Sequence, residues 1–280
     1  MTGRDVHFND IPMAVLDQVE NGLRHHFVPI VARWNQKGVP DLKLIGSGTL
    51  IDIDGKGYIL TAAHVWGATA GADTLHLLMM SGRSLVEIPC PEITARTIWN
   101  RQSPDEWGPD LALLEIPPLK LDTIKAHKSL LNFERQRASL AENPPMTEKV
   151  LWAIYGVVGE SSEVFVNLTE KSLNIDLVAR AFFCGITQTH SKADFDYYDT
   201  MANLRLPGVP SSFGGVSGGG LWQVGLSLSK SGDYSWDGRR HFRGVAFWQS
   251  SAADEQRIVR CHGPISIFER AWSAFGLPVS

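Results

Sequence analysis

Ser217 is the candidate nucleophile of this 280-residue chain. The stretch Phe213–Trp222 places five glycines around this one serine. Glycine is favoured where the backbone takes a positive φ or approaches another group closely. Such a geometry can leave a hydroxyl exposed while backbone N–H groups point toward a developing negative charge. The stretch therefore predicts a nucleophilic serine, provided that a base and an acid lie elsewhere in the chain.

His64 is the candidate base. It follows Thr61-Ala62-Ala63 at the end of an apolar segment, where small residues allow tight backbone packing and leave the imidazole at the rim of a sheet. A lone histidine is more often a core or surface residue than a catalyst. The position after an apolar strand and two alanines favours a functional role.

Asp110 is the candidate acid, and it opens the otherwise apolar segment Asp110–Ile116. An unpaired buried carboxylate is costly, so Asp110 needs a partner. It could hydrogen-bond the backbone of the preceding loop, or accept the Nδ1–H of His64 and fix the tautomer of that ring. A serine hydroxyl is a weak nucleophile until a base takes its proton, so the three residues form a coherent set. The N–H groups of Gly215 and Ser217 are the expected oxyanion hole, in which losing one donor costs about 10² to 10³ in rate.

The order His64, Asp110, Ser217 resembles that of the trypsin/chymotrypsin-like serine proteases. Within that family, the sequence is most similar in style to the bacterial trypsin-like peptidases. The matching motifs are Thr61-Ala62-Ala63-His64, Asp110-Leu111-Ala112-Leu113-Leu114 and Gly215-Val216-Ser217-Gly218-Gly219. In addition, Gly244-Val245-Ala246-Phe247-Trp248 resembles the strand that pairs with the substrate backbone. The resemblance spans about Phe27 to Phe275. It implies an all-β fold of two antiparallel six-stranded β-barrels (chymotrypsin-like), with the site in the cleft between them, and an endopeptidase that works through an acyl-enzyme.

The resemblance also implies the substrate-binding residues. Ser211, six positions before the nucleophile, would form the base of the specificity pocket, and Gln249 would narrow its mouth beside Phe247 and Trp248. An uncharged residue at the cleavage site is expected. Val216 replaces the acid that, in members activated by cleavage, pairs with a new N-terminal amine, so that mode of activation is not expected.

The spacing of apolar residues and turns along the chain predicts the domain organisation. Apolar residues at helical spacing (Met13, Leu16, Val19 and Leu23) predict a helix within an N-terminal extension, 1–26. Short strands separated by turns predict a first barrel over 27–118 and a second over 148–266. The charged segment 119–147 is the expected connection. An apolar stripe that ends near Phe275 predicts a C-terminal helix within 267–280.

Composition narrows the classes of partner. The formal net charge of −4 and the scattered basic residues give no reason to expect a nucleic acid or an anionic membrane. The three cysteines have no metal or disulfide spacing, and with no apolar leader they predict buried free thiols in a cytoplasmic protein. No metal and no cofactor are expected. The expected partners are a protein or peptide substrate and, as a hypothesis, a regulatory protein; the N-terminal helix is another candidate restraint on activity.

Two other interpretations stay open. The Gly-x-Ser-x-Gly pattern also fits the nucleophile elbow of an α/β-hydrolase esterase, with Asp254 and His262 as the later acid and base. That fold needs alternating strands and helices, which the chain before Ser217 lacks. The other interpretation is a catalytically silent barrel that serves as a protein-binding module.

Overall fold

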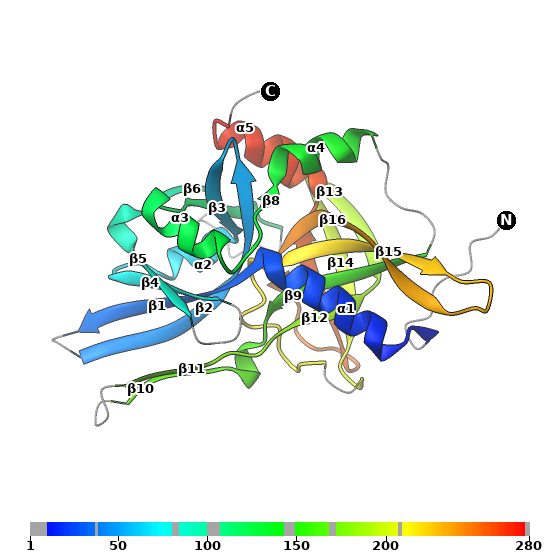
Figure 1. Cartoon of the computed structure of the whole chain (residues 1–280), viewed down its shortest axis with the longest axis horizontal. Coiled ribbons are helices and arrows are strands. Elements are labelled where there is room, and N and C mark those ends of the chain that lie inside the picture. Colours follow the sequence, from blue (N-terminus) through cyan, green and yellow to red (C-terminus); the bar gives the residue numbers. More distant parts are fainter. Residues whose placement is uncertain are drawn as a thin grey trace.

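A computed structural model describes residues 10–36, 39–79, 84–99, 107–142, 149–167, 172–206 and 209–277. The outer ends of the expected terminal segments (1–9 and 278–280), and 143–148 around the end of the expected connection, lie outside these residues. The described residues form two large β-sheets that lie next to each other, with helices around them (Figure 1).

The first sheet contains the strands of the first half of the chain. Its order is β5-β4-β1-β2-β3-β7-β6, and all these pairs are antiparallel. The short strand β8 pairs with β2 in parallel. The strands are β1 (Phe27–Gln36), β2 (Val39–Ile53), β3 (Lys56–Thr61), β4 (Thr74–Leu78), β5 (Leu85–Pro89), β6 (Thr94–Trp99), β7 (Asp110–Glu115) and β8 (Leu131–Asn132).

The second sheet is antiparallel throughout and has the order β12-β9-β15-β16-β17-β14-β13. Its strands are β9 (Val150–Val157), β12 (Ala179–Cys184), β13 (Ile186–Lys192), β14 (Phe195–Asn203), β15 (Gly220–Leu228), β16 (Tyr234–Gln249) and β17 (Gln256–His262). A separate hairpin, β10 (Glu163–Asn167) and β11 (Ser172–Asp176), extends alongside the β1–β2 ribbon (Figure 1).

Both sheets curl, because their two edge strands are neighbours in the chain. Only the short 3₁₀-helix η4 (Cys90–Glu92) and Ile93 separate β5 from β6, and only Gly185 separates β12 from β13. The ends of each edge pair must therefore meet, although no hydrogen-bonded ladder joins them in the described residues. The expected mostly-β architecture with a helix toward each end is confirmed. Two closed six-stranded barrels are not, since the described sheets have eight and seven strands and neither closes.

Three apolar clusters follow from this curling. One belongs mainly to the first sheet, includes Leu50 and extends to Tyr197 and Phe247 of the second sheet. Another lies within the second sheet and includes Val216. A third packs between the sheets and includes Ile51. Leu50 and Ile51 belong to different clusters because successive side chains of a strand point to opposite faces. The sheets are thus joined through an apolar interface, which fixes the relative position of any residues that face it.

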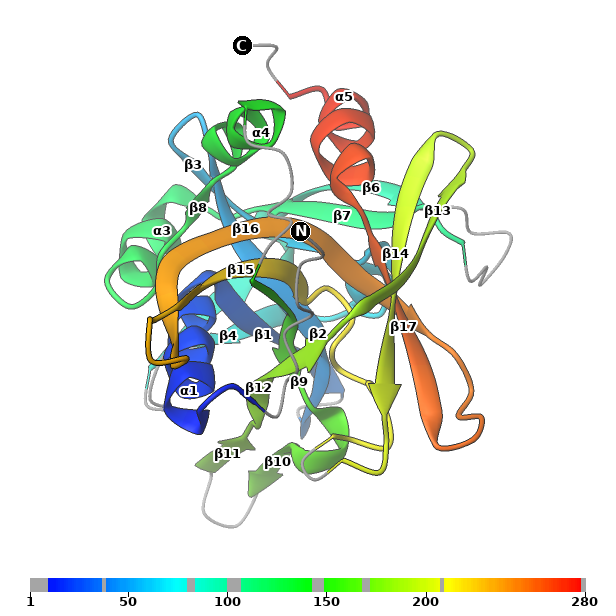
Figure 2. The same ribbon diagram turned by 90° about the vertical axis from the view of Figure 1, so that its right-hand side faces the viewer.

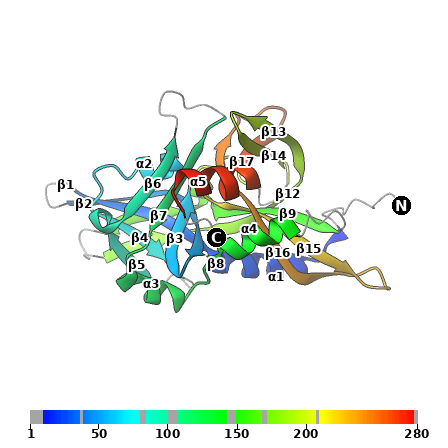
Figure 3. The same ribbon diagram turned by 90° about the horizontal axis from the view of Figure 1, so that it is seen from above.

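Helices cover the outside of this core. They are α1 (Met13–Leu23), α2 (Ala63–Gly67), α3 (Pro118–Lys125), α4 (Phe133–Glu142), a π-helical turn (Ser266–Ala271) and α5 (Trp272–Ala274), with the 3₁₀-helices η2 (Arg24–His26) and η5 (Gly159–Ser161). Figures 2 and 3 show α4 beside the C-terminal helix, where Phe133 stacks on Trp272. The connection 119–147 is thus largely helical in its described part.

The N-terminal helix forms as expected, and three of the four residues that predicted it are buried. Val15, Leu16, Val19 and Leu23 are buried in the cluster between the sheets, whereas Met13 is 70% exposed. Met13, the first residue of the helix, is the exception among the expected residues, and Val15 is buried in addition to the other three. No helix in the described part of the chain combines the length and apolar character needed to cross a membrane.

Candidate active site

His64 and Asp110 are in direct contact. The carboxylate Oδ2 of Asp110 lies 2.5 Å from Nδ1 of His64, and its Oδ1 accepts the backbone N–H of His64 at 2.9 Å. The Asp110 side chain is 11% exposed and that of His64 is 40% exposed. This pattern orients the imidazole from both its ring and its backbone, and keeps part of the ring open to solvent. A neutral His64 that donates from Nδ1 has Nε2 free to accept a proton.

The local sequence explains this placement. Asp110 begins β7, and Thr61 ends β3, the strand that pairs with β7 through Thr61 and Ala112. The chain then turns into α2, where Ala62 and Ala63 are fully buried. Two methyl side chains at this turn allow the backbone N–H of His64 to reach the carboxylate of the neighbouring strand.

Ser217 approaches this pair from the second half of the chain. Its carbonyl accepts the backbone N–H of Ser47 in β2 at 2.8 Å. A side chain at Gly46 would meet both Val65, the residue after His64, and the Ser217 carbonyl, with contacts of 2.8 and 2.9 Å from its Cβ. The serine loop and the histidine turn therefore lie against the same short piece of β2. No hydrogen bond joins the Ser217 hydroxyl to His64 in the part of the chain that the structure describes.

The backbone of the glycine-rich loop shows which of its N–H groups are free. The carbonyls of Gly214, Gly215, Val216 and Ser217 accept hydrogen bonds from Gly159 N, Ser47 Oγ, Gly219 N and Ser47 N, respectively. The N–H groups of Gly214, Val216, Gly218 and Gly219 donate to Ser212 Oγ, Phe213 O, Ala246 O and Val216 O, respectively. Within residues 214–219, only the N–H groups of Gly215 and Ser217 have no acceptor among the described residues.

Those two groups are the ones that the sequence predicts as the oxyanion hole. In a planar trans peptide the N–H points opposite to the C=O of the same unit. Gly214 O accepts from Gly159, so the Gly215 N–H points away from Gly159. Val216 O accepts from Gly219, so the Ser217 N–H points away from Gly219. Gly215 has a φ of +90°, a conformation that glycine takes without strain.

A cavity of about 230 Å³ lies next to Ser217. It is lined by Phe213, Val216, Ser217, Ala246, Phe247, Trp248, Gln249 and Val259. None of these side chains is charged, and most are apolar. The expected substrate-binding residues Phe247, Trp248 and Gln249 are thus brought together with the nucleophile candidate.

Gln249 spans one side of this cavity. Its Oε1 accepts the N–H of Phe213 at 2.9 Å and a hydrogen bond from Arg257 at 2.7 Å, while its Nε2 lies 3.4 Å from Ser212 Oγ. These contacts tie β16 to the segment that precedes the glycine-rich loop. They fix the amide beside the cavity, where the sequence predicts a narrowed mouth.

Ser211 is placed elsewhere. It is not among the residues that line the cavity; it is exposed, and its hydroxyl and N–H both donate to the carboxylate of Glu160. The hydroxyl hydrogen bond, together with those from the N–H groups of Ser211 and Ser212, lowers the pKa of Glu160. Ser211 thus holds the loop to η5, and the apolar walls of the cavity come from Val216 and Val259 instead.

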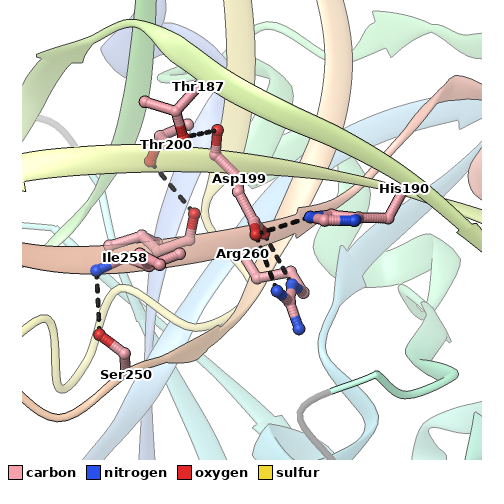
Figure 4. Close-up of polar contacts among 8 residues, drawn as sticks. Thr187, His190, Asp199, Thr200, Ser250, Ile258 and Arg260 are labelled. Atoms are coloured by element: carbon pink, nitrogen blue, oxygen red, sulfur yellow. Dashed lines mark hydrogen bonds and ion pairs between the residues drawn. The ribbon is translucent and has the colours of Figure 1, made fainter.

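A buried ion pair between Arg260 and Asp199 lies next to the Trp248 ring. Asp199 on β14 accepts hydrogen bonds from Arg260 on β17 at 2.6 and 2.7 Å, and its Oδ2 lies 3.0 Å from His190 (Figure 4). The Arg260 guanidinium carbon lies 3.8 Å from the centre of the Trp107 ring and 5.1 Å from that of Trp248. Such cation–π contacts favour one position of each indole. This cluster could not be recognised in the sequence, since its members come from four strands and a loop.

His262 does not serve as the base of a hydrolase-type triad. It is fully buried at one end of β17, whereas Asp254 lies in the exposed turn before that strand. Burial lowers the pKa of His262 to about 3, and its Nε2 accepts the backbone N–H of Asp110 at 3.1 Å. The antiparallel sheets also differ from the parallel sheet of α/β folds. The esterase interpretation is therefore set aside.

The cysteines are all free. Cys261 is buried, whereas Cys90 and Cys184 are partly exposed, so the expectation of buried thiols holds for one of the three. The described residues contain no group of three or more His, Cys, Asp and Glu side chains placed to bind a metal ion.

Comparison with known proteins does not assign this chain to a family. No protein-family model matches the sequence, and no curated protein matches it. The geometry of the site is therefore the basis on which a function can be inferred.

Proposed function

We propose that this protein is a serine endopeptidase of the trypsin-like type, in which Ser217, His64 and Asp110 act as nucleophile, base and orienting acid. The observation that carries the proposal is the pair of free N–H groups at Gly215 and Ser217, in a loop that lies against the same piece of β2 as the histidine turn. The 2.5 Å contact of His64 with Asp110 supports it. The two curled sheets then correspond to the two barrels of that family.

The proposed reaction follows from these positions. His64 Nε2 takes the proton of the Ser217 hydroxyl as its oxygen attacks the substrate carbonyl, and the two N–H groups bind the resulting oxyanion. The imidazolium then protonates the leaving amine, and water releases the acyl group from Ser217 by the same route. The missing hydrogen bond from Ser217 to His64 is compatible with this scheme, since catalytic contacts are often longer without substrate.

The cavity suggests the substrate class. Its uncharged, largely apolar lining and its volume of about 230 Å³ favour an apolar side chain at the residue before the scissile bond. A buried lysine, arginine, aspartate or glutamate would have no counter-charge in that lining. The proposed substrate is therefore a protein or peptide with an uncharged, apolar residue at the cleavage site.

Labelling with a fluorophosphonate probe tests the proposal, because the probe reacts with an activated serine. Wild-type protein should be labelled at Ser217, and Ser217→Ala should not. A peptide-library cleavage profile should show apolar residues before the scissile bond and no cleavage by Ser217→Ala. Cleavage mainly after charged residues would contradict the substrate class.

The second candidate is a catalytically silent fold that binds another protein. The absence of a hydrogen bond from Ser217 to His64 favours it. No labelling of Ser217 and no peptide cleavage, with correctly folded protein, would select this candidate over the peptidase.

A further inference from the structure

The glycine-rich loop needs a structural reason to keep Gly215 N–H and Ser217 N–H free. Glycine populates positive and negative φ almost equally, so the Gly214–Gly215 peptide has little intrinsic preference for the observed orientation. Turning this peptide over would direct the Gly215 N–H away from its present direction and remove one of the two donors. The loop is therefore held by its contacts with other segments.

The Gly214–Gly215 peptide is held directly by the N–H of Gly159, which donates to the Gly214 carbonyl at 2.8 Å. Ser47 makes two further contacts, with the neighbouring Gly215–Val216 and Ser217–Gly218 peptides. Its hydroxyl donates to the Gly215 carbonyl at 2.7 Å and accepts the N–H of Val157 at 3.0 Å, and its own N–H donates to the Ser217 carbonyl at 2.8 Å. The two carbonyls lie on either side of Val216, so one residue fixes the loop on both sides of that position. Ser47 is fully buried, which excludes water as a competing partner.

Ser47 is itself held rigidly. Its carbonyl accepts the hydroxyl of Thr61 at 2.7 Å, and Thr61 is also fully buried. Thr61 precedes the His64 turn, so Ser47 connects three parts: the turn that carries the base, strand β9 through Val157, and the nucleophile loop. The glycines on both sides, Gly46 and Gly48, permit this close approach: a Cβ on either would lie within 3 Å of a neighbouring side chain.

Val216 is the second anchor. It is 1% exposed and packs in the apolar cluster within the second sheet, with Phe213, Leu221 and Ala246 among its members. A carboxylate at this position would be buried in an apolar cluster, an unfavourable arrangement unless a cation entered with it. An apolar side chain is buried there without any charged partner.

We infer that the buried Ser47 hydroxyl and the buried Val216 side chain together hold the oxyanion loop in its donor orientation, so that the site is set without a charge released by cleavage. This inference builds on the proposed peptidase function and assigns Ser47 as a positioning residue. The site would then be competent without cleavage of the chain, and control of activity would come from substrate choice or a partner, not from a zymogen switch.

The test compares Ser47→Ala with Ser266→Ala in the full-length protein. Ser266 is a matched control: it is fully buried, its hydroxyl donates to Asp196 O at 2.7 Å, and it accepts Asp196 N–H at 2.9 Å. Both variants lose a buried hydroxyl with one donor and one acceptor role. Only Ser47→Ala loses a contact to the loop.

The first readout is independent of activity. Amide hydrogen exchange of Val216 and Gly218, whose N–H groups are bonded in the observed loop, should become at least about 10-fold faster in Ser47→Ala and stay unchanged in Ser266→Ala. Equal exchange in Ser47→Ala and wild type would overturn the role of Ser47, whatever the activity of the protein.

The second readout is kinetic. Complete loss of one oxyanion donor costs about 10² to 10³ in kcat, so partial misplacement in Ser47→Ala should lower kcat about 10- to 100-fold, with KM nearly unchanged. The affinity for a peptide aldehyde, whose adduct with Ser217 carries an oxyanion, should fall by a similar factor. An unchanged kcat and aldehyde affinity would overturn the inference. If the wild-type protein is inactive but its loop exchange depends on Ser47, the peptidase proposal fails and the structural role of Ser47 stands.

Discussion

The backbone N–H of Asp110 donates a hydrogen bond to Nε2 of His262 over 3.1 Å. His262 is fully buried, and its ring stacks on that of Phe247 with 4.4 Å between the centres. Since Nε2 accepts, the ring proton is on Nδ1 and the histidine is neutral. A buried neutral histidine thus fixes the start of β7, and through it the carboxylate that contacts His64.

This neutral histidine predicts a loss of stability in acid. Burial lowers the pKa of His262 to about 3 and that of His26 to about 4, whereas both bind a proton near pH 6.5 when unfolded. Between about pH 4 and 6.5 the unfolded state therefore binds more protons, so the free energy of unfolding falls as the pH falls. Each histidine contributes a slope of about 1.4 kcal/mol per pH unit in its window. Urea unfolding at pH 7.5, 6.0 and 5.0 measures this dependence of the free energy of unfolding on pH.

Substitution of each histidine separates the contributions of His262 and His26 to this pH dependence. His262→Gln keeps an acceptor for Asp110 N–H but cannot titrate, so its slope should be smaller than that of wild type by about one proton. His26→Gln should reduce the slope in the same way. A slope equal to wild type in both variants would show that other groups cause the acid sensitivity.

Asp110→Asn should reduce kcat by about 10⁴ while preserving the fold. The amide retains an oxygen for the His64 backbone N–H but cannot hold the ring in the tautomer that leaves Nε2 free as a base. Peptide hydrolysis by purified protein measures the effect. Asp52→Asn is the control, because Asp52 Oδ1 likewise accepts a backbone N–H, that of Gly55, in a turn outside the site. Equal rates for the two variants would remove Asp110 from the proposed triad.

Gly218→Ala should destabilise the protein strongly. Gly218 has a φ of +87°, and a Cβ there would lie 2.0 Å from Ser47 O and 2.1 Å from Thr61 Oγ1, both fixed groups. We expect a loss of at least about 3 kcal/mol in the free energy of unfolding. Gly185→Ala, where nothing lies within 4 Å, should change it by less than about 0.5 kcal/mol. Urea denaturation of the two variants makes the comparison, and similar midpoints would contradict the close packing of the loop against β2.

Deletion of residues 1–24 should unfold the protein and not activate it. The helix within this segment contributes Val15, Leu16, Val19 and Leu23 to the cluster between the sheets, and none of its residues lines the cavity. This expectation is the opposite of the one that follows from the hypothesis of the helix as a removable restraint. Leu23→Ala, a smaller change, should lower the free energy of unfolding by about 2 to 5 kcal/mol, whereas the exposed Met13→Ala should have little effect. Thermal unfolding checks both substitutions. A folded deletion variant with higher activity would support the restraint hypothesis and contradict this prediction.

Much of the strand pattern could be predicted from the sequence, because short apolar segments between turns reflect local preference and alternation. The strand Gln256–His262 was not predicted, although Ile258 and Val259 lie in it. Its flanking arginines obscure the apolar pattern, and one of them, Arg260, is buried through its ion pair with Asp199. A charge that is neutralised across a sheet cannot be recognised from its own strand.

The sequence by itself determined the candidate nucleophile, base, acid and oxyanion donors, since each depends on a side-chain type or a glycine within a short motif. Only the tertiary structure decided which groups hold them. Ser47 lies 170 positions before Ser217 in the chain (217 − 47) yet binds both sides of its loop, and Ser211, expected in the pocket, binds Glu160 instead. Such contacts depend on how two sheets pack. That packing is a sum of many small apolar contributions, which no single motif records.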